Sequence, residues 1–176
     1  MKIMISAGEA SGDMHAASAL QQLKALSKGR SVEAFGMGGK RLADCGMELL
    51  VDTRDHAVMG LVEVLHKYPQ LRANLNSLKR AIKDRKPDVL LLVDYPHFNM
   101  KLAAEAKALD VPVMYYIAPK VWASRAGRVQ ELAECVDQMA VIFPFEVDIF
   151  EKAGIKTRYV GNPVLENKSL VQAQQQ

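Results

Sequence analysis

The sequence predicts an α/β fold with a mostly parallel sheet covered by helices on both faces. Strand-like apolar runs alternate with helix-like patterns along most of the chain, which is typical of parallel sheets. The run Val89–Val93 is apolar throughout, as expected of a central strand buried on both sides. A turn containing two glycines follows the first strand-like run, where folds of this class place their ligands.

Six runs have the composition of strands. In chain order they are Lys2–Ser6, Val32–Gly36, Val89–Val93, Val111–Ile117, Gln138–Ile142 and Thr157–Val160. The length of 176 residues suits one domain with a proper core, which we expect over residues 1–163. Residues 164–176 are polar towards their end and are expected to form a tail or the stub of a linker.

The turn after the first strand has the composition of a binding site. Its candidate substrate-binding residues are Gly8, Glu9, Ser11, Gly12 and Asp13. The two glycines allow the backbone to approach a ligand closely, because they have no side chain. The amides at the start of the helix that follows favour an anionic group.

An apolar segment with one acid precedes a long helical pattern. The segment Met59–Leu65 contains Gly60 and Glu63, and it suits either a core helix or the wall of an acyl-chain pocket. Helical spacing from Pro69 to Lys86 then predicts one apolar stripe. Its members are Leu71, Leu75, Leu78 and Ile82.

A basic stripe lies beside this apolar stripe. Its members are Arg72, Lys79, Lys83 and Lys86. Seven basic residues face a single acid between positions 67 and 86. The stripe suits a solvated face of a core helix, or a surface that contacts anionic lipid. Nucleic acid is not an expected partner, because no aromatic platform or known binding motif accompanies the charge.

Asp94 directly follows the buried strand Val89–Val93. A carboxylate at the carboxyl end of a central parallel strand points into the ligand crevice, where it can serve as a general base. The alternative is a structural aspartate that caps the next helix. Asn99 has the same two interpretations, a helix cap or a ligand contact.

The later strand-like runs also end in candidate contacts. Pro119 and Trp122 follow the run Val111–Ile117 and suit either a sugar or lipid contact or simple packing. Phe143–Glu146 repeats this arrangement after the next run.

Several classes of protein are not indicated. No apolar run approaches the roughly 18 residues of a membrane span, and the start lacks the features of a secretory signal. The cysteines and histidines lack the spacing of a metal site, so neither a metal nor another cofactor is expected. Phosphate-loop, dinucleotide and serine-hydrolase motifs are missing from the expected positions. The net charge of +3 is modest.

Six segments in order resemble the lipid-A-disaccharide synthase family. They are Ala7–Asp13, Ala57–Val64, Val93–Asn99, Tyr116–Ala123, Phe143–Glu146 and Val160–Pro163. The resemblance implies a GT-B-type fold of two Rossmann-like halves, of which this chain matches the amino-terminal, acceptor-side half. The carboxyl-terminal UDP-binding half is then absent.

The resemblance also implies a reaction. An inverting glycosyltransferase moves 2,3-diacylglucosamine from its UDP derivative to 2,3-diacylglucosamine 1-phosphate, without a metal, at the cytoplasmic face of the inner membrane of Gram-negative bacteria. Asp94 matches the proposed general base, and Glu9 and Ser11 match polar residues of the first loop. The matched segments further imply substrate contacts. These are Met59, Gly60, Glu63, Asn99, Pro119, Trp122, Glu146 and Asn162.

Two positions depart from the family pattern. His97 stands where many members have a second acid, and Ser124 where many have a second tryptophan.

Since one wall of the cleft is missing, we expect the isolated chain to fold and to have little or no transferase activity. The alternatives are a binding module for lipid and membrane without chemistry, and another enzyme of this fold such as a UDP-sugar epimerase.

Overall fold

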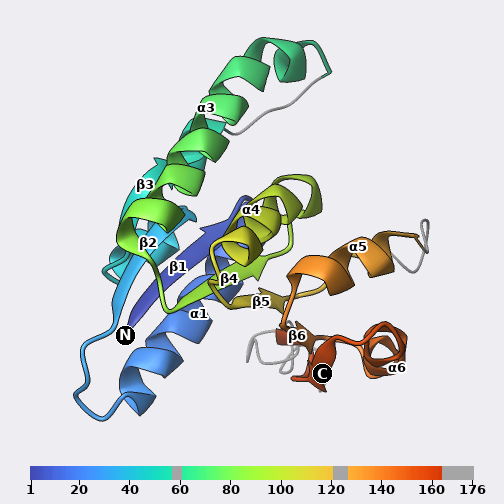
Figure 1. Ribbon diagram of the computed structural model, residues 1–176. Coiled ribbons are helices and arrows are strands. Elements are labelled where there is room, and N and C mark those ends of the chain that lie inside the picture. Colours follow the sequence, from blue (N-terminus) through green and yellow to red (C-terminus); the bar gives the residue numbers. More distant parts are fainter. Residues whose placement is uncertain (57–60, 121–126, 164–176) are drawn as a thin grey trace, which may run out of the picture.

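The computed structural model describes residues 1–56, 61–120 and 127–163, and only the backbone of residues 55–56 and 61–67. The described residues form one seven-stranded parallel sheet with the order β3-β2-β1-β4-β5-β6-β7 (Figure 1). The strands are β1 (Lys2–Ala7), β2 (Glu33–Gly38), β3 (Glu48–Asp52), β4 (Val89–Val93), β5 (Val113–Tyr116), β6 (Gln138–Val141) and β7 (Lys156–Tyr159). The helices are α1 (Ala10–Leu26), α2 (Lys40–Asp44), η1 (Thr53–His56), α3 (Leu61–Arg85), α4 (Pro96–Ala108), α5 (Gly127–Cys135) and α6 (Phe145–Lys152).

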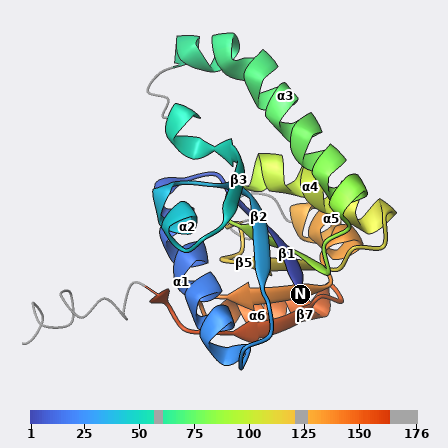
Figure 2. The same ribbon diagram turned by 90° about the vertical axis from the view of Figure 1, so that its left-hand side faces the viewer.

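Helices cover both faces of this sheet, as the sequence predicts. On one face, α1 and α2 lie side by side (Figure 2). They cover a cluster of buried residues that includes Ile5, Leu20 and Leu42. On the other face, α3, α4, α5 and α6 contact one another in that order and cover a larger cluster. Residues of one strand contribute alternately to the two clusters, because successive side chains of a strand point to opposite faces of the sheet.

The strand order reverses between β1 and β4. The chain runs outward from β1 to β3 and returns through α3 to β4, which pairs with β1 from Ile3–Val89 to Ala7–Val93. In open parallel sheets, ligands bind beyond the carboxyl ends of the strands at such a reversal. The turns after Ala7 and Val93 therefore meet where a ligand site is expected.

The structure corrects two predictions about the elements. Strand β3 is absent from the six predicted runs, because Glu48–Asp52 is short and has an acid at each end. It is an edge strand, and its apolar residues Leu49 and Leu50 are only half-buried. The helical pattern assigned to Pro69–Lys86 begins earlier, at Leu61, and Pro69 lies inside the helix.

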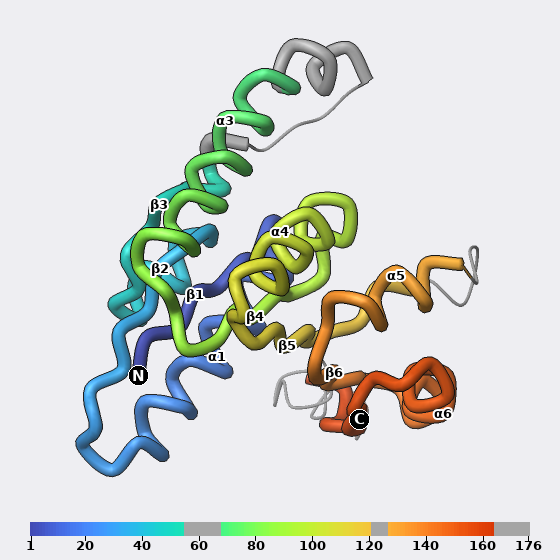
Figure 3. Tube along the Cα trace, viewed as in Figure 1, coloured from blue at the N-terminus to red at the C-terminus, as the bar shows by residue number. Residues whose placement is uncertain are grey.

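The two ends of α3 differ in their packing. Leu78 and Ile82 are fully buried, as the predicted stripe requires, whereas Leu71 is 37% exposed and Tyr68 is 59% exposed. From Tyr68 onward, the part of the helix that is drawn in colour extends away from the strands (Figure 3). At the other end, Lys86 takes a left-handed φ of 44° directly before Pro87, and this combination ends the helix.

Candidate functional site

A small pocket of about 90 Å³ lies at the carboxyl ends of the central strands. It is lined by Ser11, Gly12, His15, Asp94, Ile117, Ile142, Asn162 and Pro163. The structure thus brings together four of the predicted site residues from the first turn of α1, the end of β4 and the segment after β7. Their convergence at the reversal of strand order makes this pocket the candidate site.

Backbone in unusual conformations borders this pocket. Asp94 and Tyr95 have φ values of 45° and 51°, and Ile117 has a φ of 61°. Left-handed conformations are uncommon for residues other than glycine, and most of all for a β-branched residue such as Ile117. Such conformations persist only where the surrounding structure fixes them, and they occur most often at functional sites.

Asn99 is fully buried, and its side-chain amide forms hydrogen bonds with other residues of the protein. Its Nδ2 donates to the carbonyl oxygen of Asp94 at 2.7 Å and to those of Ser6 and Val93 at 3.3 Å. Its Oδ1 accepts a hydrogen bond of 2.6 Å from Ser6 Oγ. The side chain therefore links the ends of β1 and β4, and its expected contact with substrate stays a prediction.

The two glycines of the first turn have different surroundings. A Cβ on Gly8 would lie 2.3 Å from Cδ1 of Tyr95, so the aromatic ring itself requires glycine there. A Cβ on Gly12 would lie no closer than 3.6 Å to its neighbours, which is an ordinary contact. Of these two glycines, Gly12 is the one that lines the pocket, although most of its surface is buried.

Asp13 has a structural role. Its carboxylate is buried and accepts hydrogen bonds from the backbone N–H groups of Gly39, Arg41 and Leu42 at 2.7, 3.0 and 3.2 Å. It thereby satisfies the unpaired amides at the start of α2. Because these bonds occupy both oxygens, we do not include Asp13 in the proposed substrate site.

His15 was not among the predicted site residues, although it lines the pocket with Asp94 and Ser11. Partial burial lowers the pKa of its imidazole from the ordinary value of 6.5, which favours the neutral form. Neutral imidazole can both donate and accept a hydrogen bond. Its spacing is the sequence signal that could have identified it: His15 lies four positions after Ser11, and residues four apart share one face of a helix.

A larger groove of about 680 Å³ runs between α3 and the start of α4. Its lining combines apolar, aromatic and basic side chains. It includes Tyr68, Leu71, Arg72, Leu75, Asn76, Lys79, Tyr95, Phe98 and Lys101, and Glu9 lies at its edge near Tyr95. Glu9 therefore belongs to this groove, whereas Ser11 belongs to the small pocket.

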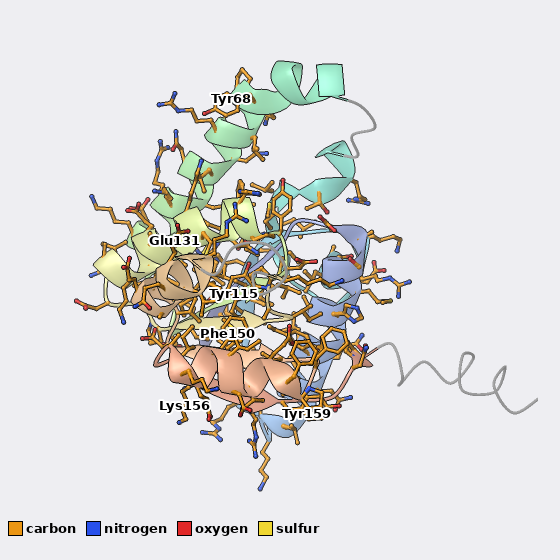
Figure 4. The ribbon with its side chains drawn as sticks, turned by 90° about the vertical axis from the view of Figure 1, so that its right-hand side faces the viewer. Tyr68, Tyr115, Glu131, Phe150, Lys156 and Tyr159 are labelled. Atoms are coloured by element: carbon orange, nitrogen blue, oxygen red, sulfur yellow. The ribbon has the colours of Figure 1, made fainter. Side chains whose placement is uncertain are left out.

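A third cavity of about 190 Å³ lies between α4 and α5. Pro119 is buried and lines it together with His97, Lys101, Arg128 and Glu131. It shares Pro96, His97 and Lys101 with the groove, so the two hollows meet at the start of α4. Figure 4 shows Glu131 on one side of the molecule and Tyr68 high on α3.

The remaining predicted residues lie elsewhere. Glu146 is buried, and its Oε2 accepts a hydrogen bond of 3.2 Å from the N–H of Phe143, so it stabilises the start of α6. Met59, Gly60 and Trp122 lie outside the described residues, and Glu63 lies where only the backbone is described. Their expected contacts stay predictions.

The basic stripe of α3 is not uniform. Lys79 is half-buried and forms an ion pair of 2.9 Å with Glu105 of α4. Arg72, Lys83 and Lys86 are exposed, and Lys86 lies just beyond the end of the helix. Within the part of the chain that the structure describes, no helix combines the length and apolar character needed to cross a membrane.

Comparisons with known proteins agree with this architecture. A UDP-GlcNAc 2-epimerase from Neisseria meningitidis, solved with bound UDP-GlcNAc, superposes with a TM-score of 0.65 at 14% identity, over 100% of this chain and 53% of that one. A second UDP-N-acetylglucosamine 2-epimerase superposes with a TM-score of 0.64 at 16% identity, over 92% of this chain and 48% of that one. At such low identity these likenesses show the fold alone, and they confirm the Rossmann-like prediction.

The sequence relatives are more specific. The lipid-A-disaccharide synthase of Myxococcus xanthus is 50% identical over 94% of this chain and 43% of its own length. That of Geobacter metallireducens is 46% identical over 96% of this chain and 43% of its own length. This chain thus spans less than half the length of these relatives. Since the model of the lipid-A-disaccharide synthetase family matches residues 3–176, the chain belongs to that family.

Proposed function

We propose that this chain supplies the acceptor-side half of a lipid-A-disaccharide synthase. The complete enzyme would transfer 2,3-diacylglucosamine from its UDP derivative to 2,3-diacylglucosamine 1-phosphate and release UDP. Family membership supports the reaction class. The observation that carries the assignment to this site is the position of Asp94, which borders a pocket at the reversal of strand order together with Ser11 and Gly12.

Asp94 acts as the general base in this proposal. Its carboxylate takes the proton from the 6-hydroxyl of the acceptor while that oxygen attacks the anomeric carbon of the donor. The bond from the anomeric carbon to the UDP oxygen breaks, UDP carries away the electron pair, and the configuration inverts. Such proton transfer by a positioned side chain contributes about 10²- to 10⁴-fold in rate.

The pocket itself suits the end of a sugar and not a whole lipid. Its 90 Å³ is well below the roughly 300–1,000 Å³ of usual small-molecule sites, so it would take only one group of the sugar, such as the hydroxymethyl group that carries the reacting oxygen. Ser11, Gly12 and Asn162 would orient that group beside Asp94. Gly12 lines the pocket beside Asp94, and its lack of a side chain would allow the sugar to approach the backbone there.

The groove between α3 and α4 suits the remainder of the acceptor. Leu71, Leu75 and Phe98 offer apolar contacts for acyl chains, and Lys101 offers a cation for the 1-phosphate. Its 680 Å³ lies within the usual range of small-molecule sites. The segment Met59–Leu65, whose last five residues begin α3, would extend the acyl-chain contacts.

The exposed part of the basic stripe would bind an anionic membrane surface. Arg72, Lys83 and Lys86 are available for this role, whereas Lys79 is engaged by Glu105. Each well-placed cation contributes about 1 kcal/mol next to anionic lipid. We therefore place the enzyme as a peripheral protein at the cytoplasmic face of the inner membrane.

The test is UDP release in mixed micelles containing both lipid substrates. This chain would be joined after Pro163 to the carboxyl-terminal part of the Myxococcus xanthus relative, and we call the product the completed enzyme. We expect the completed enzyme to release UDP and the isolated chain to release little or none, because the donor-binding wall is missing. In the completed enzyme, Asp94→Asn should lower the rate about 100-fold or more.

Two controls make the result decisive. Lys107→Gln in the completed enzyme changes an exposed charge on α4 remote from the pocket, and it should leave UDP release unchanged. Acceptor binding without UDP release from the completed enzyme would contradict the proposal and favour a non-catalytic lipid-binding module. Equal rates for Asp94→Asn and the parent would contradict the role of Asp94.

A further inference from the structure

We infer that Tyr115 and Asn99 are positioning residues, which hold the Asp94 carboxylate in the pocket by clamping the backbone carbonyl of Asp94. The inference rests on the proposed function, because it concerns how the general base is placed. We call the two donors and the carbonyl oxygen that they share the clamp.

The turn that the clamp holds is strained. Asp94 and Tyr95 both adopt left-handed φ values, 45° and 51°, and neither is glycine. Aspartate tolerates this region better than most residues, whereas tyrosine does not. A strained pair of this kind needs specific contacts to keep it from relaxing.

Both hydrogen bonds of the clamp are short, and both donor residues are buried. The Tyr115 hydroxyl donates to the carbonyl oxygen of Asp94 at 2.6 Å, and Asn99 Nδ2 donates to the same oxygen at 2.7 Å. Tyr115 and Asn99 are both fully buried. Figure 4 shows Tyr115 in the middle of the molecule, away from the surface. The two bonds use both lone pairs of that oxygen, so its orientation is fixed.

Each donor is itself held in place. Ser6 Oγ donates to Asn99 Oδ1 at 2.6 Å, which orients the amide so that its Nδ2 faces the carbonyl oxygens. Tyr115 lies in β5, which pairs with β4 and places Tyr115 next to Leu92 in the register. Burial raises the pKa of the Tyr115 phenol, so it remains a donor across the working range of pH. One donor from β5 and one from α4 therefore share one carbonyl oxygen, and Ser6 of β1 orients the donor from α4.

This arrangement controls the carboxylate through the backbone. The clamp keeps Asp94 at its left-handed φ of 45°. Relaxation to a negative φ would turn Cβ about the N–Cα bond and move the carboxylate away from Ser11 and His15, which line the same pocket. A misplacement of 1 Å in an active site can lower the rate about 100-fold. The clamp therefore affects the rate of the chemical step more than the binding of substrate.

The experiment uses Tyr115→Phe in the completed enzyme, because it removes one hydroxyl and keeps the ring. We expect kcat to fall about ten-fold with KM unchanged, since one of two donors remains. Ser6→Ala should give a smaller fall in the same direction, because Asn99 loses the bond that orients it. Ile82→Val is the matched control: it removes one buried methyl group from α3, remote from the turn, and should leave kcat unchanged.

A second measurement separates this inference from the proposed function. In the isolated chain, the backbone NMR shifts and couplings of Asp94 and Tyr95 report their φ values, and Tyr115→Phe should shift both residues while Ile82→Val shifts neither. Unchanged signals would overturn the clamp, as would a kcat equal to that of Ile82→Val. Absence of UDP release from the parent completed enzyme would overturn the proposed function, and the NMR result would still decide on the clamp.

Discussion

Two turns meet at the candidate site, and they reach their conformations in opposite ways. The turn after β1 uses glycine, and Gly8 leaves space for the ring of Tyr95. The turn after β4 uses no glycine, and Asp94 and Tyr95 adopt left-handed conformations that buried hydrogen bonds maintain. The conformation of the turn after β1 depends on its own glycine, whereas that of the turn after β4 depends on hydrogen bonds from residues distant in the sequence.

The comparison shows where each kind of turn is vulnerable. A glycine turn fails when a side chain is added to it, because the space is already occupied. An imposed turn fails when a distant partner is removed, because its own residues favour other conformations. Substitutions in each turn and in its partners can separate these two modes.

The largest expected loss of stability comes from Asn99→Ala. This change removes the donor to three carbonyl oxygens and the acceptor of Ser6 Oγ, all near the buried ends of β1 and β4. Each unsatisfied buried group costs about 1–3 kcal/mol, so we expect a loss of about 3 kcal/mol in the free energy of unfolding. Urea denaturation of the isolated chain measures it. A loss below about 1 kcal/mol would mean that the second turn holds its own conformation.

Gly8→Ala should be the next most damaging change. The new Cβ would lie 2.3–2.7 Å from three ring atoms of Tyr95, so the ring or the turn must move. Overpacking of this kind costs about 1–3 kcal/mol. Thermal unfolding followed by circular dichroism measures the loss. Full stability in this variant would show that the two turns are independent of each other.

Gly12→Ala is the matched control for Gly8→Ala. The added Cβ makes only ordinary contacts, and Gly12 lies within α1, where alanine is favoured over glycine by about 1 kcal/mol. We expect unchanged or slightly higher stability, combined with weaker binding of 2,3-diacylglucosamine 1-phosphate by isothermal titration calorimetry. A destabilised Gly12→Ala variant would contradict the view that the glycine serves a ligand.

The smallest effect should come from the pH dependence of His15. Its pKa is lower in the folded chain than the ordinary value of 6.5, so the unfolded chain binds more protons in this range. The contribution of His15 to stability is therefore complete above pH 6.5 and decreases as the pH falls below that value. The difference in stability between the parent chain and His15→Gln, followed from pH 8 to pH 5, should show this slope. If the stabilities of the two proteins changed in parallel with pH, this contribution of His15 would be contradicted.

The sequence predicted the parts of the site that depend on local signals. Asp94 follows an apolar strand and Ser11 lies between the glycine turn and a helix pattern, so local sequence alone places both at the ends of strands. The hydrogen bond from Tyr115 could not be predicted, because it depends on β5 pairing with β4 at one particular register. Strand β3 was missed because its alternation is weak and its position at the edge leaves its apolar residues half-buried.

The link between Asp13 and α2 has a consequence for protein engineering. A Cβ on Gly39 would lie 2.9 Å from Oδ2 of Asp13, and the N–H of Gly39 donates to the same carboxylate at 2.7 Å. The first turn and the start of α2 are therefore one transferable unit, although 26 positions separate these two residues. Loop grafts between relatives that exchange residues 8–13 should carry the partner glycine with them, and libraries that diversify position 39 alone should yield mostly destabilised members.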